Sequence, residues 1–307
     1  MEYRRLGNSG LKVSEVSLGG NRFGWQVGEQ ASIAIINHAL EMGINFIDTA
    51  DLYDQGRSEE FVGKTVKSKR SQVIIATKFG YETGNSRYHI MKAVDASLRR
   101  LQTDHIDLYQ IHLPDATTPI EETLRTLDNL VQAGKVRYIG CSNFAAWQLC
   151  EALWTSKVNN LESLVTIQTR YNLLERQAET ELVPCCQAYG VGVIPWGPLA
   201  GGFLTGKYRH GEKPPPNKLL SRPMLLYTNI FTEANWNKLA KLEAFAAERG
   251  HTVGELAIAW LRTKPWVNTV IVGAEKIEEV SANVAAAEWK LRPEEVTEVE
   301  AIVEAIS

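Results

Sequence analysis

Several features that mark other classes of protein are scarce or absent in this chain of 307 residues. It has four cysteines and no C-x-x-C or Cys/His pair at ligand spacing, so neither a disulfide framework nor a metal site is indicated. No apolar run approaches the ~18 residues of a membrane span, and the N-terminal residues lack the apolar core of a signal peptide. We therefore expect no metal, no membrane contact and a cytoplasmic location, where free thiols persist.

An excess of charge of one sign is lacking as well. The 33 basic and 36 acidic residues leave a formal net charge of −3, and no strongly basic block occurs. This balance argues against nucleic acid or an anionic membrane as the main partner and favours a small molecule. With a hydrophobic content of 44 %, a chain of this length can bury a stable core without a disulfide or a structural metal.

What the sequence does contain is a regular alternation of short β-rich runs with helical patterns. The first seven runs begin on the order of 30 residues apart, which is the size of a βαβ unit, and a long insertion breaks this spacing before the eighth. Helical apolar spacing occurs at 31–42, 90–101, 120–133, 147–154 and 256–261. The eight predicted strands span 15–19, 44–48, 73–78, 106–112, 136–143, 164–168, 192–196 and 268–273.

Eight such units favour an α/β fold with one closed parallel barrel, a (β/α)8 TIM barrel, in a single domain over 1–307. The alternative is an open doubly wound sheet, but no G-x-G-x-x-G stands between the first strand and the first helix. Three further elements are predicted: a β-hairpin at about 1–14, a long loop at about 197–234 that contains an insertion at 209–234, and a C-terminal helix at about 293–306.

Polar residues close five consecutive predicted strands, at the end where such barrels carry their active sites. They are Asp48, Lys78, His112, Asn143 and Gln168. Each has an ordinary explanation by itself, because Asp and Asn cap helices and a lone His is often part of a core. Five in succession favour a site.

Tyr53 lies five residues past Asp48, near enough to reach the same mouth of the barrel. A neighbouring Lys78 ammonium would lower the pKa of the Tyr53 phenol and make it a general acid. Asp48 would hold Lys78 charged, and His112 would orient a substrate carbonyl. The predicted chemistry is therefore proton transfer coupled to the delivery of a hydride.

These residues belong to longer motifs, which are GINFIDTADLYDQGRSEEFVG (43–63), VIIATKFG (73–80), IDLYQIH (106–112), GKVRYIGCSNF (134–144), QTRYN (168–172), WGPLAGGFLTGKY (196–208) and IVGAEKIEEVSANV (271–284). With these motifs the sequence resembles the aldo-keto reductase family over essentially its whole length. The stretch WGPLAGGFLTGKY is most similar to the branch that holds the potassium-channel β subunits and bacterial sugar or glyceraldehyde reductases.

The resemblance implies a catalytic tetrad of Asp48, Tyr53, Lys78 and His112, in which the tyrosine protonates the substrate oxygen as hydride leaves a nicotinamide. It also implies that Ser142, Asn143 and Gln168 hold the nicotinamide carboxamide. Trp196 would stack on the ring, where the family normally carries Tyr. The cofactor-binding residues expected on this basis are Gly20, Asn21, Asp48, Ser142, Asn143, Gln168, Trp196, Gly197, Pro198, Leu199, Gly202, Lys207, Gly273, Lys276, Glu279 and Asn283.

The resemblance makes NADP(H) the first choice of cofactor, with NAD(H) as the alternative. Glu279 stands four residues before Asn283, where a basic residue often grips the 2′-phosphate, and a carboxylate there favours a ribose hydroxyl. Lys276 could still supply a cation. Lys207 ends GGFLTGK, a near match to the phosphate-loop pattern that fails at Tyr208, and the resemblance places it near the pyrophosphate.

The expected function is an NAD(P)H-dependent oxidoreductase that reduces an aldehyde, ketone or sugar, or oxidises the alcohol in reverse. A nucleotide-sensing regulatory protein with weak reductase activity is the alternative. A barrel enzyme that uses Lys78 as a Schiff base is a third reading, which the adjacent Asp48 disfavours. The expected substrate rim is Trp25, Tyr53, Phe79 and His112, and the partner is a small carbonyl or sugar; an oligomer is compatible with this reading.

Overall fold

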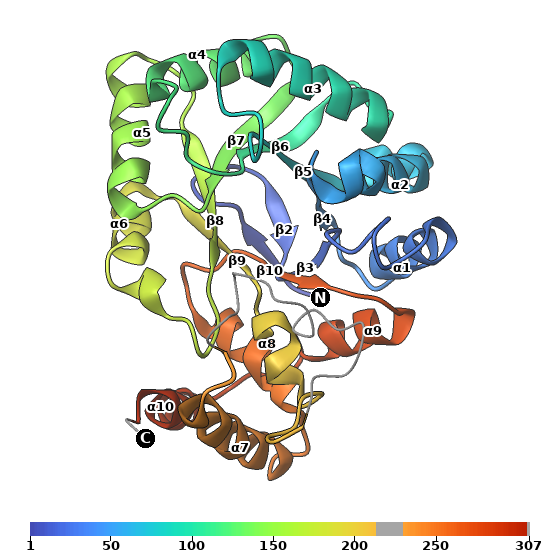
Figure 1. Ribbon diagram of the computed structural model, residues 1–307, viewed down its shortest axis with the longest axis vertical. Coiled ribbons are helices and arrows are strands. Elements are labelled where there is room, and N and C mark those ends of the chain that lie inside the picture. Colours follow the sequence, from blue (N-terminus) through green and yellow to red (C-terminus); the bar gives the residue numbers. More distant parts are fainter. Residues whose placement is uncertain (213–229, 306–307) are drawn as a thin grey trace.

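The computed structural model describes residues 1–212 and 230–305, with the strands in the middle of the molecule and the helices around them (Figure 1). Eight parallel strands form one sheet in the order β10-β3-β4-β5-β6-β7-β8-β9. The two outer strands approach each other through a parallel bridge between Val193 and Val267, and the Val193 N–H donates to Trp266 O at 3.1 Å. The sheet is therefore a nearly closed (β/α)8 barrel, as predicted.

Each predicted parallel strand is present, although most are a residue or two shorter or longer than expected. The strands are β3 (Val16–Gly19), β4 (Phe46–Asp48), β5 (Ile74–Phe79), β6 (Ile106–Ile111), β7 (Val136–Ser142), β8 (Leu164–Arg170), β9 (Gly192–Trp196) and β10 (Val270–Gly273).

Helices follow the strands and cover the outside of the barrel. They are α1 (Glu29–Glu41), α2 (Arg57–Val66), α3 (Arg87–Leu101), α4 (Ile120–Gln132), α5 (Ala146–Val158), α6 (Leu182–Tyr189), α7 (Glu233–Ala247), α8 (Val253–Thr263), α9 (Ile277–Ala285) and α10 (Pro293–Glu304). The described residues also form short 3-10 helices: η1 (Tyr53–Gly56), η2 (Lys67–Gln72), η3 (Gln177–Glu179) and η4 (Ala200–Thr205).

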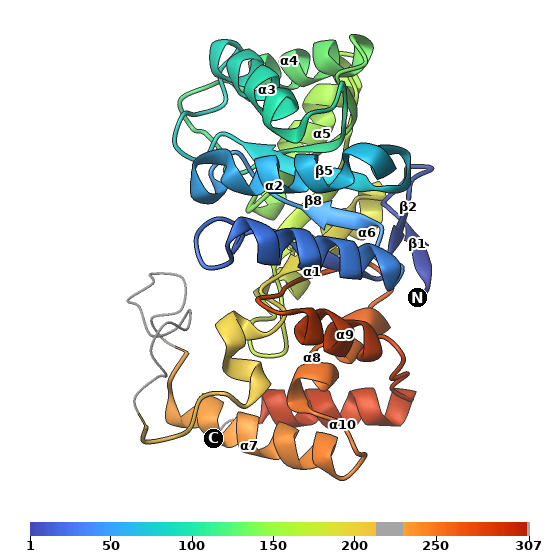
Figure 2. The same ribbon diagram turned by 90° about the vertical axis from the view of Figure 1, so that its right-hand side faces the viewer.

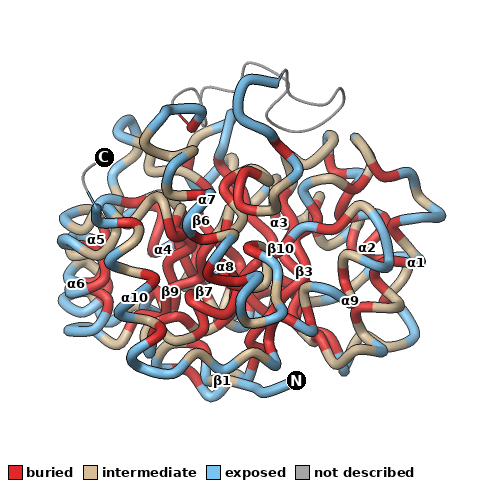
Figure 3. Tube along the Cα trace, turned by 90° about the horizontal axis from the view of Figure 1, so that it is seen from below, coloured by how far each residue is buried: buried red, intermediate tan, exposed pale blue. Residues whose placement is uncertain are grey.

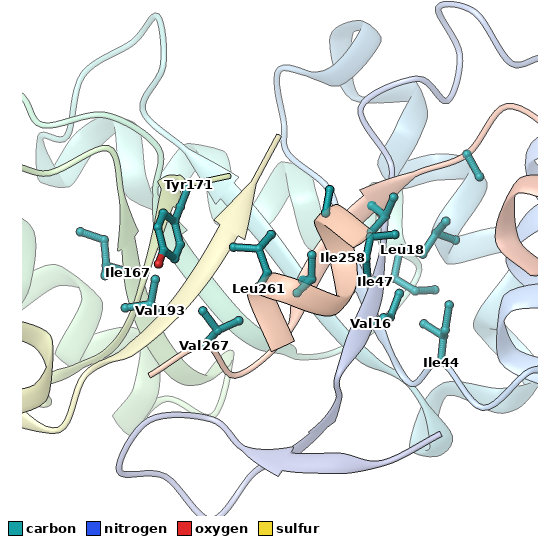
Figure 4. Packing of buried hydrophobic residues seen from close by; sticks show 14 of the residues in the cluster. Val16, Leu18, Ile44, Ile47, Ile167, Tyr171, Val193, Ile258, Leu261 and Val267 are labelled. Carbon is teal, nitrogen blue, oxygen red and sulfur yellow. The ribbon is translucent and has the colours of Figure 1, made fainter. Parts of the chain in front are cut away.

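The core has two layers because successive strand residues face opposite sides of the sheet. The larger layer lies between the strands and the helices, and Figure 4 shows part of it, including Leu18, Ile47 and Ile258. The smaller layer fills the barrel itself with side chains such as Phe46 and Leu108. Burying one such aliphatic or aromatic side chain stabilises the fold by about 1.5–3 kcal/mol. Seen from below, the parallel strands are mostly buried, whereas β1 of the hairpin and much of the outer helical surface are exposed (Figure 3).

The predicted hairpin is present and closes one end of the barrel. Its strands β1 (Tyr3–Arg5) and β2 (Lys12–Ser14) are antiparallel, and Figure 2 shows them on one face of the molecule. Leu6 and Val13 belong to the cluster inside the barrel, and both are fully buried. The Arg4 guanidinium binds Glu15 at 2.6 Å and the carbonyl of Val267 at 2.9 Å, which fastens the hairpin to the barrel floor.

The predicted long loop at about 197–234 differs from the structure at both ends. It contains the 3-10 helix η4, and α7 already begins at Glu233 because the Thr232 hydroxyl accepts from the N–H of Asn235 at 3.2 Å and caps the helix. Residues 213–229 of the predicted insertion lie outside the described residues. The C-terminal helix α10 lies beside α7 (Figures 1 and 2) and ends at Glu304, two residues before the predicted end.

All four cysteines are free, and Cys141 and Cys186 are buried. Within the described residues, no helix has the length and apolar character needed to cross a membrane.

Candidate active site

A cavity of about 700 Å³ opens where the parallel strands end at their carboxyl termini. Asp48 of β4, Ser142 of β7 and Gln168 of β8 line its floor, with His112 just after β6 and Trp196 at the end of β9. The strands therefore bring together residues that are separated by up to 148 positions in the sequence. This is the face on which parallel α/β barrels carry their active sites.

The centre of the cavity floor is an ion pair between Lys78 and Asp48. The Lys78 ammonium donates to Asp48 Oδ2 at 2.7 Å, to the carbonyl of Thr49 at 2.9 Å and to the Tyr53 hydroxyl at 3.1 Å. Lys78 is fully buried, and Asp48 is 2 % exposed. Burial alone would lower the pKa of Lys78, but Asp48 and Tyr53 together outweigh burial, and the pKa is raised. Lys78 is thus a fixed cation beside the Tyr53 oxygen.

Tyr53 stands at the start of η1, in a turn with unusual backbone angles. The two residues after it, Asp54 and Gln55, have φ of 49° and 57°, a left-handed conformation that is strained for residues other than glycine. Burial raises the pKa of Tyr53, and the Lys78 ammonium offsets only part of that effect. The predicted lowering of this pKa is therefore wrong, because the sequence indicated the neighbouring cation but not the burial.

His112 faces the same point from the end of β6. Its ring lies edge-on to that of Tyr53, with 6.1 Å between the ring centroids, and the ring of Tyr81 packs against it at 4.9 Å. Burial, and to a lesser degree the Lys78 ammonium, lowers the pKa of His112 to about 3. The imidazole is therefore neutral at physiological pH and can donate or accept a hydrogen bond without carrying charge.

The amide side chains at the cavity floor are already engaged with their neighbours. Gln168 Nε2 donates to Asp48 Oδ1 at 2.7 Å. Asn143 donates through Nδ2 to the carbonyl of His112 and to the Ser142 hydroxyl, both at 3.0 Å, and its Oδ1 accepts from the Trp196 indole at 3.1 Å. The sequence indicated these residues but not the Trp196–Asn143 bond, which a Tyr at that position could not make in the same way.

Most of the expected cofactor-binding residues line the cavity, and two do not. Gly20 lies behind the wall, where its N–H donates to Asp48 O at 2.7 Å and an added Cβ would meet the Ser58 hydroxyl at 2.8 Å. Lys276 stands at the N-cap of α9 and does not reach the lining. The expected residues that do line it are Asn21, Asp48, Ser142, Asn143, Gln168, Trp196, Gly197, Pro198, Leu199, Gly202, Lys207, Gly273, Glu279 and Asn283.

Among the described residues, two ion pairs cross the far end of the cavity. Lys207 pairs with Glu279 at 2.9 Å, and Arg22 pairs with Glu275 at 2.5 Å. The Glu279 carboxylate also accepts the N–H of Glu275 at 2.8 Å. Two cations and two carboxylates thus meet where α9 begins. The sequence indicated Glu279 and Lys207 but missed Arg22, because 253 residues separate it from its partner.

Two residues of the expected substrate rim lie elsewhere. Phe79 is 1 % exposed and stacks on Tyr109 with 4.6 Å between ring centroids, on the helix side of the sheet. Its direction follows from alternation along β5, since Lys78 faces the barrel interior and the next residue must face outward. Trp25 is 42 % exposed and is not part of the lining. The residues that sequence reasoning missed here are Leu52, Tyr81 and Leu113.

The lining suits a dinucleotide, which combines flat rings with a charged pyrophosphate. Gly197, Gly201 and Gly202 have φ of 66°, 67° and 96° and bring bare backbone to the wall, where a phosphate can approach closely. Lys207 and Arg22 supply cations at the same end, and the indole of Trp196 offers a flat surface in the same cavity as Tyr53. Among the residues that the structure describes, no group of three or more His, Cys, Asp or Glu side chains converges as a metal site requires.

Comparison with known proteins agrees with this geometry. Residues 15–304 match the sequence model of the Aldo/keto reductase family. A probable voltage-gated potassium channel subunit beta of Oryza sativa subsp. japonica is 36 % identical, and the match covers 99 % of this chain and 97 % of that protein. Versiconal hemiacetal acetate reductase of Aspergillus parasiticus is 36 % identical, over 98 % and 96 %. An aldo-keto reductase of Alternaria alternata is 34 % identical, over 97 % and 90 %.

Proposed function

The chain belongs to the aldo/keto reductase family, and from this premise we propose that it transfers hydride between NAD(P)H and an aldehyde, ketone or sugar carbonyl, or runs in reverse on the alcohol. One observation carries the proposal. Tyr53 and His112 stand at one point of the cavity, and the Tyr53 hydroxyl lies 3.1 Å from a buried, charged Lys78. A proton donor fixed beside a cation suits a carbonyl oxygen that gains negative charge.

Tyr53 is the proposed general acid of the reduction and the base of the reverse reaction. Its raised pKa keeps the phenol protonated at neutral pH, which is the form that gives a proton to a carbonyl oxygen. Lys78, held charged by Asp48, stabilises the phenolate that remains. The neutral His112 imidazole orients the carbonyl, and a nicotinamide supplies the hydride when bound.

The residues that would hold the nicotinamide are the polar floor residues and one flat wall. We assign the carboxamide to Ser142, Asn143 and Gln168, which line the cavity beside Asp48. The Trp196 indole provides the stacking surface, and its hydrogen bond to Asn143 Oδ1 at 3.1 Å holds the two side chains in place. Toward the far end, the glycines of η4 and the Lys207 ammonium suit the pyrophosphate.

NADP(H) remains the proposed hydride donor. NAD(H) is the alternative, which the carboxylates of Glu275 and Glu279 favour. Lys207 and Arg22 are suitable cations for a 2′-phosphate, but each is paired with a glutamate at the same end of the cavity. Paired titrations of both reduced nucleotides, followed by protein fluorescence, decide between them. Binding of NADH tenfold tighter than NADPH would overturn the choice of NADP(H).

We place this single-barrel enzyme in the cytoplasm, a reducing compartment in which its four thiols stay free. A nucleotide-sensing regulatory protein with weak reductase activity is the second candidate. The similarity to a probable voltage-gated potassium channel subunit beta supports it, since that name describes a subunit of a channel. The complete constellation of Asp48, Tyr53, Lys78 and His112 favours the reductase.

Single-turnover stopped-flow kinetics tests the proposal. The protein is loaded with NADPH or NADH and mixed with a generic aldehyde, and absorbance at the nicotinamide band is followed. We expect rapid oxidation of the bound nucleotide in the parent protein and a loss of about a hundredfold or more in Tyr53→Phe, with nucleotide affinity kept. Nucleotide binding without oxidation by any aldehyde, ketone or sugar would instead favour the sensor.

A further inference from the structure

Gln110 is a fully buried amide in the interior of the barrel, directly beneath the site. It lies on β6, in register with Lys78 of β5 on one side and Gly140 of β7 on the other. Leu108, two residues earlier, belongs to the apolar cluster inside the barrel, so alternation places Gln110 on the same inner face.

The Gln110 amide reaches the carboxylate on which the site depends. Its Nε2 lies 3.5 Å from Asp48 Oδ1, the oxygen to which Gln168 Nε2 donates at 2.7 Å. Lys78 binds the other oxygen, Asp48 Oδ2. Two amides therefore share Oδ1, with Gln168 at close range and Gln110 at the outer limit of a hydrogen bond.

Burying a glutamine amide inside the barrel destabilises the fold if the side chain only fills space. Its Oε1 is buried and has no hydrogen-bond partner in the described part of the chain. Gly140 leaves room for the side chain, since a Cβ there would lie 3.3 Å from Gln110 Cγ. An apolar side chain of equal length would fill the same space without an unpaired polar atom. The contact with Asp48 is the gain that the amide provides.

We propose that Gln110 is a positioning residue, which keeps the Asp48 carboxylate aligned with Lys78 when Gln168 turns its amide to the nicotinamide carboxamide. The inference rests on the proposed function, which assigns Gln168 to that carboxamide. Gln168 both lines the cavity and donates to Asp48 through Nε2, so a turn of this amide toward the carboxamide weakens its bond to Asp48 Oδ1. Gln110 does not line the cavity and stays available to Oδ1 throughout.

The consequence for the reaction passes through Lys78. An Asp48 carboxylate with no donor on Oδ1 is free to rotate about its side-chain torsion, and its bond to Lys78 loosens. Lys78 then no longer holds the Tyr53 hydroxyl at a fixed place. Loss of the Gln110 amide is therefore expected to slow turnover without weakening nucleotide or substrate binding.

Gln110→Met separates this role from a structural one, because methionine keeps the length and removes the amide. We expect an unfolding temperature within about 2 °C of the parent or higher. The value of kcat should fall about fivefold to tenfold, with KM for aldehyde and nucleotide within about twofold. A purely structural Gln110 would lower stability and leave kcat alone, and that result would overturn the proposal.

Gln110→Glu supplies a second readout that does not depend on the methionine variant folding. In its protonated form, the introduced carboxyl group would donate to Asp48 as the amide does, whereas in its ionised form it would repel that carboxylate. The kcat of this variant should therefore fall as pH rises from about 5 to 8, while the parent profile stays flat. A Gln110→Glu profile parallel to the parent's would contradict the proposal.

A third measurement uses protein without nucleotide. If both amides serve Asp48 Oδ1, the unfolding free energies of Gln110→Met and Gln168→Met should not add in the double variant, whereas independent residues add. If the two changes in unfolding free energy add in the double variant, Gln110 and Gln168 do not share Asp48 Oδ1, and the proposal is contradicted. A parent protein with no aldehyde-dependent nucleotide oxidation would refute the proposed function, whereas an active parent with unchanged Gln110 variants would refute this inference alone.

Discussion

The hydroxyl oxygen of Tyr53 lies 3.1 Å from Nζ of Lys78, and the Lys78 side chain is fully buried. On its other side, Lys78 binds Asp48 at 2.7 Å. Water does not reach this ammonium, so its charge acts on Tyr53 with little screening. The raised pKa keeps the phenol protonated at neutral pH. In the proposed reduction, the phenol gives this proton to the carbonyl oxygen, and the Lys78 ammonium stabilises the phenolate that is left.

The rate of reduction should not titrate through His112. The pKa of His112 is lowered to about 3, so the imidazole stays neutral from about pH 5 to 9. In the proposed mechanism Tyr53 acts when protonated, and its pKa is raised above the ordinary value, so reduction should be lost only as pH rises through that alkaline pKa. We expect a flat kcat for reduction between about pH 5 and 9. A change in kcat near the ordinary histidine pKa of about 6.5 that disappears in His112→Ala would contradict this prediction, because it would show that His112 titrates in this range.

Glu279→Gln should change the choice between the two nucleotides. The variant removes the carboxylate that pairs with Lys207 at 2.9 Å and leaves the ammonium available to a phosphate. We expect affinity for NADPH to rise about tenfold relative to NADH, and to become more sensitive to salt. Fluorescence titration with both nucleotides at two ionic strengths measures this. Glu278→Gln, on the same helix but outside the cavity lining, is the matched control.

Asp51→Asn should stabilise the protein at neutral pH. Burial, with a contribution from Glu59, raises the pKa of Asp51 from 3.8 to about 6. The folded state therefore binds the proton more tightly than the unfolded state, and stability falls as pH rises from about 4 to 6. Asparagine removes the buried charge, with an expected gain of about 1 kcal/mol at about pH 7.5. Urea unfolding should show the gain at about pH 7.5 and none at about pH 4; a loss at both would contradict this.

Gln55 tests the strain in the turn that carries Tyr53. Its φ of 57° suits glycine, and its side chain is exposed. Gln55→Gly should change the unfolding free energy by less than about 0.5 kcal/mol, since relief of strain offsets the added chain entropy. Gln55→Val should cost about 1–2 kcal/mol and lower kcat, because a β-branched residue resists this conformation. Equal stability of the two variants would remove the strain argument.

The fold was predictable because its evidence is local and repeated. Each strand has its own apolar run and each helix its own spacing, and a count of eight gives the barrel without any long-range contact. Helix faces were harder to predict. The apolar spacing at 147–154 predicted α5 correctly, yet Trp147 and Trp154 are 66 % and 48 % exposed, because helical periodicity does not say which side meets the sheet.

The sequence predicted the site residues that stand at the ends of strands. It did not predict properties that depend on the surrounding side chains, such as burial and partners distant in sequence. Alternation from Lys78 could have placed Phe79 on the helix side of β5. Gln110 carries the same alternation signal, but its value depends on reaching Asp48 across the barrel. The raised pKa of Tyr53 and the partners of Arg22 depend on burial and on contacts distant in sequence, neither of which a strand-end pattern contains.

The most direct test of the central claim is to follow the transferred hydrogen. Nicotinamide nucleotide deuterated at C4, in each of its two stereochemical forms, is incubated with the protein and an aldehyde, and the alcohol is analysed by mass spectrometry and NMR. We predict one deuterium on the carbinol carbon from one of the two forms only, and almost none with Tyr53→Phe. Alcohol that carries no deuterium from either form, or no alcohol at all from any carbonyl compound, would contradict the account.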